Sequence, residues 1–416
     1  MKNKKKLLVY AHYFYPDVAS TSQILTELCE GLQDDFHITV ICVVPSYEGK
    51  VDENYKKQRI YMEKYQDIQV VRVRVPEFNK KNKISRIRNL LAYFFNSIFA
   101  TFVVEKQDLV FSISQPPILG GILGVIGKLI KRASLVYNIQ DFNPEQTEVI
   151  GYLKNKLLLN FLRALDKLSC RASDTVIVVG RDMQETLNKR FKVKNVPNSV
   201  VINNWIDENQ IYPLENNHPR VLEFKEKYEL LDKFVFMYSG NIGLYYDLEN
   251  ILKVIGKFKD VDDVVFVFVG DGSVKQTLID YVGVNGLINV KFIPYQRKED
   301  LNYSLNVADV HIVSNAKGIK GVSVPSKVYG IMATGKAVLA ILEDGSEVRL
   351  IIESNKCGVC CEPGDYEELH KLIEGIIKNR KSIKDKGVLG RVYLEENLKK
   401  ELSVLKYKQL IYGICR

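Results

Sequence analysis

The segment 315–347 combines a glycine-containing loop, a helix start and a lysine, a pattern that can bind a diphosphate. Four residues form the expected helix start: Val324, Pro325, Ser326 and Lys327. Pro325 suits a first-turn position, and Gly335 can end the helix before the apolar run 337–342, which is typical of a buried strand. Free amides and the positive end of the helix dipole, beside Lys327, would attract a diphosphate. The pattern also fits an ordinary loop–helix–strand unit without a ligand.

Strands alternate with helices throughout the chain, which predicts parallel α/β sheets. In the first half, strands are expected at 7–11, 37–45, 70–75, 109–112, 135–139, 175–179 and 200–202. In the second half, they are expected at 234–238, 264–269, 290–293, 310–313, 337–342 and 358–361. The length of 416 residues indicates two domains, at 1–205 and 206–394, with a hinge near 205–219. Residues 48–66 are charged and tyrosine-rich without a clear period, so we expect a mobile loop, and 365–416 should be helical.

Charge is unevenly distributed between the two halves. Residues 1–205 carry 30 Lys/Arg and 20 Asp/Glu, and residues 206–416 carry 29 and 30, so the halves are +10 and −1. This asymmetry suits a first half that faces an anionic partner, but no nucleic-acid recognition motif accompanies it. Seven cysteines and five histidines show no zinc spacing, and no apolar run reaches the roughly 18 residues of a membrane span. We expect a cytoplasmic protein without a metal site.

Several motifs, in order, resemble the donor-binding half of glycosyltransferase family 4. They are GNIG, GDG, PSKVYGIMATGKAV and the pair Ser346-Glu347. The similarity covers nearly the whole chain and is greatest for the bacterial amino-sugar transferases of capsule, O-antigen and exopolysaccharide assembly. It implies an α/β GT-B fold, with two Rossmann-like doubly wound domains facing across a cleft and a helical C-terminal tail. It also implies that residues beyond about 395 return to the first domain.

The resemblance places donor binding in the second domain. Its expected residues are Ser239, Gly240, Asn241, Gly243, Gly270, Asp271 and Gly272, although both segments could be simple turns. Tyr295 would pack on the nucleobase or in the core. Glu347 would accept hydrogen bonds from ribose or sugar hydroxyls, or would only favour the helix dipole. The paired glutamates of the family correspond here to Val322 and Gly330, so the chain departs from the family pattern at the ribose site.

The resemblance also suggests residues near the reaction centre. Asp141 and, less directly, Glu145 match a His-Asp position of relatives, although Asp141 could instead cap a helix. Five residues of the loop after the first strand would shape the acceptor site: Tyr15, Pro16, Ala19, Ser20 and Thr21. Lys327 and the amides of 239–243 would stabilise the departing diphosphate. The acidic run 260–263 contains a DxD sequence, which we interpret as a solvated turn.

Residues 80–104 place five Lys/Arg ahead of an aromatic and aliphatic segment. This combination favours contact with an anionic membrane surface, although a core helix with a basic start also fits. We expect a peripheral protein at the inner face of the cell membrane.

The function implied is retaining transfer of a sugar from a nucleotide-sugar, expected to be a UDP-N-acetyl sugar, to a polyprenyl-diphosphate-linked saccharide. No cofactor or essential metal is expected. Two alternatives remain: a UDP-sugar epimerase of the same fold, which would need acid/base groups, and a non-catalytic nucleotide-sugar-binding subunit of a polysaccharide assembly complex, which the missing glutamates favour.

Overall fold

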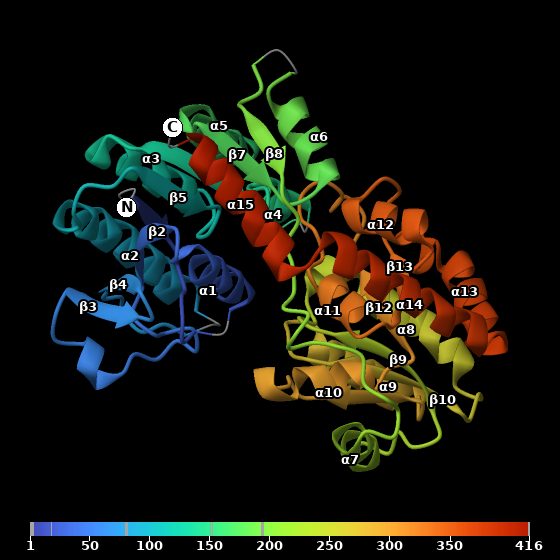
Figure 1. Cartoon of the computed structure of the whole chain (residues 1–416). Helices are drawn as coiled ribbons and strands as arrows, with labels where there is room; N and C mark the ends of the chain where they lie inside the picture. The colour runs from blue at the N-terminus through green and yellow to red at the C-terminus, as the bar shows by residue number, and fades with distance from the viewer. Residues whose placement is uncertain are drawn as a thin grey trace. The chain divides into compact units, whose positions relative to one another are not determined.

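The chain divides into two compact units in a computed structural model that describes residues 4–17, 19–79, 82–149, 151, 153–192 and 195–414. Unit 1 is Met1–Asn203 with Ser403–Arg416, and unit 2 is Asn204–Leu402 (Figure 1). The return to unit 1 therefore begins at Ser403 and not near residue 395. The reason is that α14 (Arg380–Asn397) packs on unit 2, where Gly387 lies against the backbone at Gly335.

Unit 1 contains an eight-stranded sheet in the described part of the chain. Its strands are β1 (Lys5–Tyr10), β2 (Phe36–Val43), β3 (Ile60–Tyr65), β4 (Ile68–Val73), β5 (Leu109–Ile113), β6 (Ser134–Ile139), β7 (Thr175–Val178) and β8 (Ser199–Val201). The order is β3-β4-β2-β1-β5-β6-β7-β8, and every pair is parallel except β3 with β4. The inner strands are mostly buried apolar runs, as expected for a sheet with helices on both faces, whereas the edge strands β3 and β8 are half-buried or exposed.

The helices of unit 1 connect these strands. They are α1 (Ser20–Leu32), the 3₁₀ turn η1 (Glu53–Tyr55), α2 (Lys83–Val103), α3 (Leu119–Lys131), α4 (Glu145–Val149), α5 (Lys156–Ala172), α6 (Arg181–Arg190) and α15 (Lys400–Ile414). Although α15 is the last helix of the chain, it packs in unit 1: the Tyr407 hydroxyl accepts from Asn138, and Val404 contacts Gly31 of α1. None of the helices in the described ranges has both the length and the apolar content needed to cross a bilayer.

The prediction of a mobile loop at 48–66 is wrong. This segment holds η1 and the edge strand β3, which pairs antiparallel with β4. The buried Arg72 of β4 donates to Glu63 of β3 at 2.5 Å, and Tyr55 donates to the same carboxylate at 2.7 Å. An edge strand that faces solvent on one side alternates charged and half-buried residues, so it lacks the apolar run of the inner strands.

Unit 2 contains a six-stranded parallel sheet in the order β11-β10-β9-β12-β13-β14. Its strands are β9 (Phe234–Ser239), β10 (Val264–Val269), β11 (Val290–Ile293), β12 (Val310–Ser314), β13 (Ala337–Ile341) and β14 (Gly358–Cys361). Its helices are α7 (Pro219–Lys227), η2 (Leu244–Tyr246), α8 (Leu248–Ile255), η3 (Gly256–Phe258), α9 (Lys275–Asn285), η4 (Lys298–Asp300), α10 (Leu301–Asn306), α11 (Lys327–Ala333), α12 (Glu347–Asn355), α13 (Tyr366–Lys378) and α14. The predicted strands and the helical tail are confirmed.

In each sheet, the chain first adds strands toward one edge and then returns to the middle and adds strands toward the other edge, so that there is one topological switch point. In unit 1 this point lies between β1 and β5, and in unit 2 between β9 and β12. Open α/β sheets bind ligands in the crevice at such a point, beyond the carboxyl ends of the strands. The loops that follow β1, β5 and β6, and those that follow β9, β10 and β12, are therefore the places to look for a site.

Candidate functional site

Two glycine turns lie side by side at the carboxyl edge of the unit 2 sheet. Gly240 follows β9 with φ +136°, and Gly270 follows β10 with φ +142°, a backbone region that side chains disfavour. A Cβ atom on Gly270 would lie only 2.0 Å from the Gly240 carbonyl oxygen, and one on Gly272 only 2.1 Å from the Ile242 oxygen. Glycine is required at these positions because the two turns pack directly on each other.

The backbone amides of the first turn are largely occupied. Gly240 donates to the Val269 carbonyl at 2.9 Å and Ile242 donates to the Asp271 carbonyl at 2.8 Å. These two amides are therefore not available for a diphosphate, contrary to the expectation for 239–243. Asn241 and Asp271 are exposed beside the turns, Gly243 is buried, and Ser239 is the last residue of β9. The turns contribute a surface without side chains next to the lysine described below.

Lys327 lies against this surface. An ideal Cβ atom on Gly240 would be 3.7 Å from the Lys327 Nζ atom. The Nζ atom lies 3.8 Å from the ring centroid of Tyr238 and 4.2 Å from that of Tyr246, so the ammonium has two cation–π contacts. It is buried and has no hydrogen-bond partner among the described residues. Burial lowers the pKa of Lys327 to about 7, because the charged form is poorly solvated there.

The helix that carries Lys327 begins later than predicted. Ser326 is its N-cap and α11 starts at Lys327, so Pro325 precedes the helix and does not occupy its first turn. The amides of Val328 and Tyr329 donate to the carbonyls of Pro325 and Ser326 at 3.4 and 3.2 Å, and Val324 packs against the core below. Gly335 ends the helix with φ +66°, as predicted. The amides of Val328 and Tyr329 are thus used within the helix start, and the Lys327 side chain is the charged group at this site.

Other residues that were expected to bind the donor lie in the same unit. Tyr295 follows β11 and is 69% exposed. Glu347 is 3% exposed in the first turn of α12. The loop 316–322 is held by Glu343, whose Oε2 atom accepts from the amides of Gly318 and Lys320 at 2.8 and 2.9 Å.

Sequence reasoning missed three side chains of this site. Tyr238 and Tyr246 hold the Lys327 ammonium, and Lys275 donates to the Gly270 carbonyl at 2.8 Å. The sequence contains an indication of these residues: Tyr238 lies just before the first glycine turn, and Lys275 lies three residues after the second. Their convergence depends on packing that the sequence pattern does not specify.

In unit 1, Asp141 lies just after β6. Its amide approaches the Ser114 hydroxyl at 3.4 Å, and its carboxylate accepts from Gln146 at 3.3 Å. Burial raises the pKa of Asp141 to about 6, although a hydrogen bond from Gln115 opposes the shift. The Thr21 hydroxyl donates to Gln115 at 2.8 Å, which connects the acceptor-side loop to this carboxylate. Asp141 can therefore exchange a proton near neutral pH.

Glu145 has a different environment. Its carboxylate accepts from Arg163 at 3.0 Å and forms a close pair with Arg190, which also contacts Asp166. These arginines lower the pKa of Glu145 against the opposing effect of burial. Asp166 additionally accepts from the buried Tyr137 hydroxyl at 2.8 Å. This network joins α4, α5, α6 and β6, so Glu145 has a structural role in the described contacts.

The acceptor-side loop is partly ordered by tyrosine and arginine contacts. The Tyr15 ring stacks on Tyr65 at 4.3 Å between centroids, and its carbonyl accepts from Arg72 at 2.6 Å. Tyr15 is 49% exposed, Ala19 is buried and Ser20 is exposed. Pro16 follows a cis peptide bond. Residue 18 lies outside the described residues.

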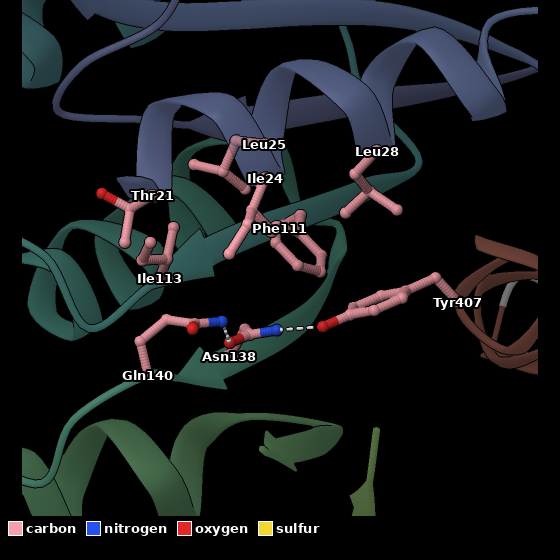
Figure 2. A pocket seen from close by; sticks show the side chains of 9 residues that line it. All are labelled: Thr21, Ile24, Leu25, Leu28, Phe111, Ile113, Asn138, Gln140 and Tyr407. Carbon is pink, nitrogen blue, oxygen red and sulfur yellow. Dashed lines mark hydrogen bonds between the residues drawn. The ribbon is translucent and has the colours of Figure 1, made fainter. Parts of the chain in front are cut away.

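A small pocket lies under this loop, between α1, strands β5 and β6, and α15 (Figure 2). Its lining is Thr21, Ile24, Leu25, Leu28, Phe111, Ile113, Asn138, Gln140 and Tyr407. Gln140 donates to Asn138 at 2.7 Å, and Asn138 donates to the Tyr407 hydroxyl at 2.6 Å. The volume of about 10 Å³ accommodates about one water molecule and no sugar. The hydrogen bond from Asn138 to Tyr407 connects α15 to the sheet of unit 1.

No group of three His, Cys, Asp or Glu side chains suited to a metal ion occurs among the described residues.

The solved structures with similar folds include Anabaena HepE in complex with UDP-glucose. It matches with a TM-score of 0.71 and 14% identity over 98% of this chain and 100% of that one. Two parallel-sheet Rossmann-like units with this similarity define the GT-B fold. The chain also matches the families described as "Glycosyl transferase 4-like domain" at residues 21–205 and "Glycosyl transferases group 1" at residues 221–387. The chain belongs to the glycosyltransferases that combine these two domains.

Two relatives cover most of the chain. "Probable glycosyltransferase WbjE" of Pseudomonas aeruginosa is 28% identical over 80% of this chain and 81% of its own length. "Putative colanic acid biosynthesis glycosyl transferase WcaI" of Escherichia coli K12 is 24% identical over 98% of this chain and 100% of its own length. The resemblance inferred from the motifs is confirmed at the level of the family.

Proposed function

We propose that this glycosyltransferase moves a sugar from a UDP-sugar to a lipid-linked saccharide during synthesis of a cell-surface polysaccharide. The observation that carries the donor half is the Lys327 ammonium, which is buried beside two glycine turns without a hydrogen-bond partner in the described chain. A diphosphate would supply the missing acceptor. An unpaired buried cation is costly, so a site that keeps one is suited to an anionic ligand.

UDP is the proposed nucleotide because a protein of the same fold, HepE, was solved with UDP-glucose. In this proposal Tyr295 stacks on the base and Glu347 accepts from ribose or sugar hydroxyls. The N-acetylated sugar is proposed from the resemblance to amino-sugar transferases. The polysaccharide context is proposed from the name of WcaI, which refers to colanic acid biosynthesis.

Catalysis would come from charge stabilisation of the leaving group. As the bond from the sugar to the diphosphate breaks, negative charge develops on the phosphate oxygens, and Lys327 stabilises it without a bound metal. Asp141 is the proposed group near the reacting carbon, in a reaction that retains configuration. Glu145 is not needed for this step, because its carboxylate already binds two arginines.

Contact with the inner face of the membrane is proposed for the outer side of α2. Six large apolar residues recur there every three or four positions and are 43–72% exposed: Ile84, Ile87, Leu91, Phe95, Phe99 and Phe102. Lys83, Arg86 and Arg88 accompany them, whereas residues 80 and 81 lie outside the described residues. A helix with such a stripe and with basic neighbours is suited to lie in the interface of an anionic membrane.

The apolar surface extends beyond α2. On α5, Leu157, Phe161 and Leu168 are 82%, 59% and 58% exposed, and Leu129 of α3 is 70% exposed. Helix α3 packs against both α2 and α5 within unit 1. A membrane would cover this apolar surface and place a lipid-linked acceptor near the enzyme.

The donor proposal is tested by thermal shift with UDP, GDP, dTDP and their sugar conjugates on wild type, Lys327→Met and the control Lys253→Met. Lys253 is an exposed lysine of the same unit, on α8, paired only with Asn250 in the described contacts. We expect UDP compounds to stabilise the wild type and the control but not Lys327→Met. Stabilisation by none of the nucleotides would contradict the donor site.

A further inference from the structure

An open groove of about 380 Å³ lies beside α2 in unit 1, and its lining shares no residue with the small pocket described above. Its lining is Val51, Lys56, Arg74, Val75, Pro76, Glu77, Ala92 and Asn96. The residues come from the segment around η1, from the chain that follows β4 and from α2. The groove is large enough for a lipid headgroup.

Two arginines stand opposite each other at the open end of the β3–β4 hairpin. Ile60 pairs with Val73, so the next pair is Arg59 with Arg74, and the Arg74 amide donates to the Arg59 carbonyl at 3.0 Å. Like charges directly opposite on neighbouring strands are unfavourable. Neither guanidinium forms an ion pair with a carboxylate in the described part of the chain. Their charge is therefore not neutralised.

Uncharged groups hold both side chains in place. Arg59 Nε donates to Asn96 Oδ1 at 2.8 Å, and Asn96 Nδ2 donates to the Arg74 carbonyl at 2.6 Å. Arg74 Nη1 donates to the Lys56 carbonyl at 2.8 Å. A guanidinium that is positioned by neutral acceptors keeps its remaining N–H groups for a phosphate, which it can bind in a bidentate manner.

The negative groups near the groove pair with Lys56 and not with the two arginines. Glu77 lines the groove, and its Oε1 atom lies 3.0 Å from Lys56 Nζ and accepts from the Val51 amide at 3.2 Å. Glu53 also pairs with Lys56, at 2.7 Å. The lysine and these two carboxylates form one cluster with a net charge of −1, so with Arg74 in the lining and Arg59 beside it the region has a net charge of +1.

The groove continues into the apolar face of α2. The Arg59 guanidinium carbon lies 4.2 Å from the ring centroid of Phe99, one of the exposed residues of that face, and Asn96 lies one helical turn from it. A phosphate site next to exposed aromatic side chains matches the two parts of a phospholipid, its charged headgroup and its hydrocarbon.

We propose that this groove binds the phosphate of an anionic phospholipid, with its acyl chains against the apolar face of α2. The inference rests on the membrane contact proposed above and adds to it a specific headgroup site. It gives the hairpin β3–β4, which directly precedes α2 in the chain, a role in orienting unit 1 on the bilayer.

The test uses the full chain and co-sedimentation with phosphatidylcholine vesicles, with and without phosphatidylglycerol. The groove variant is Arg59→Gln/Arg74→Gln, and the charge-matched control is Lys64→Gln/Lys189→Gln, two exposed lysines on β3 and α6. We expect phosphatidylglycerol vesicles to bind the groove variant at least about tenfold more weakly than the wild type. The control should change by less than about twofold, because its lysines do not line the groove and are paired with Asp67 and Glu185.

Arg59→Lys/Arg74→Lys keeps the two positive charges and the packing of the aliphatic part of each side chain. It should therefore recover part of the vesicle binding, which would show that the loss in the glutamine variant does not come from a folding defect. Equal losses in the groove variant and the control would overturn the inference, since only net charge would matter. Loss in Phe95→Ser/Phe99→Ser with none in the arginine variant would overturn the headgroup site and leave the membrane contact standing. If the wild type binds to neither kind of vesicle, both the headgroup site and the membrane contact are wrong.

A further arm uses soluble farnesyl diphosphate. If the arginine substitutions abolish its binding but leave vesicle binding intact, the groove serves a diphosphate-linked carrier, and the phospholipid assignment is wrong.

Discussion

Lys327 and Tyr238 form a buried cation–π pair, with the ammonium nitrogen 3.8 Å from the ring centroid. The tyrosine belongs to β9 and the lysine to α11, which follows β12, so the pair spans the point where the unit 2 sheet changes its direction of connection. Tyr246 completes the contact from η2, which follows the first glycine turn. The rings thus hold a cation at the ligand edge of the sheet without neutralising it, which leaves its charge for a diphosphate.

Replacing Tyr246 tests whether the rings position the lysine. Tyr246→Leu removes one cation–π contact worth about 1 kcal/mol, so UDP should bind about fivefold more weakly, as measured by isothermal titration. Tyr246→Phe keeps the ring face and should bind UDP within twofold of wild type. Equal weakening by both substitutions would mean that the hydroxyl, and not the ring, is what matters.

UDP binding should depend on pH through Lys327. Its pKa of about 7 lies below its unfolded value, so much of the free protein carries a neutral lysine above neutrality, and a bound diphosphate must recruit a proton. The Kd for UDP should rise by up to about tenfold per pH unit between pH 7.5 and 9. Titrations in two buffers with different ionisation enthalpies should show proton uptake. A Kd that stays constant over this range, with no uptake, would exclude the link.

The fold was largely predictable because the inner strands of a doubly wound sheet are continuous apolar runs. The strand 264–269 is fully buried, and its continuous apolar run predicts it directly. Strand β3 has no such run, because its side chains alternate between solvent and neighbouring tyrosines. The end of unit 2 was also misplaced, because α14 and α15 have similar compositions. Only packing distinguishes them: α14 buries Gly387 and Gly390 in unit 2, and α15 sends Tyr407 into unit 1.

The site was predictable in its glycines and lysine but not in its chemistry. The amides of Gly240 and Ile242 were expected to bind phosphate, yet the stacking of the two glycine turns uses them within the fold. The aromatic contacts of Lys327 join residues 81 and 89 positions apart, and no local pattern reports such a pair. Glu145 was a plausible catalytic residue by position, but its neutralisation depends on Arg190, far along the chain.

Asp141→Asn should make stability less dependent on pH. The carboxyl has a folded pKa of about 6, above its unfolded value near 4, so the wild type loses stability as pH rises from about 4 through 6. The amide has no such loss, and the variant should gain up to about 3 kcal/mol over the wild type at pH 7.5 but nothing at pH 4. Urea unfolding at both pH values measures the difference. A gain of equal size at pH 4 would show that the effect does not come from the raised pKa of the Asp141 carboxyl.

Glu145→Gln and Asp166→Asn distinguish a catalytic Glu145 from a structural one. Arg190 is buried between both carboxylates, so removing either charge should destabilise unit 1, by about 3–5 kcal/mol for the more buried Asp166 and less for Glu145. Once folded at low temperature, Glu145→Gln should keep most of its sugar-transfer rate and should bind UDP like the wild type. Thermal unfolding gives the first quantity, and initial rates with a UDP-sugar and an acceptor extract give the second. A fall in rate of a hundredfold or more with unchanged unfolding temperature would instead place Glu145 in the chemical step.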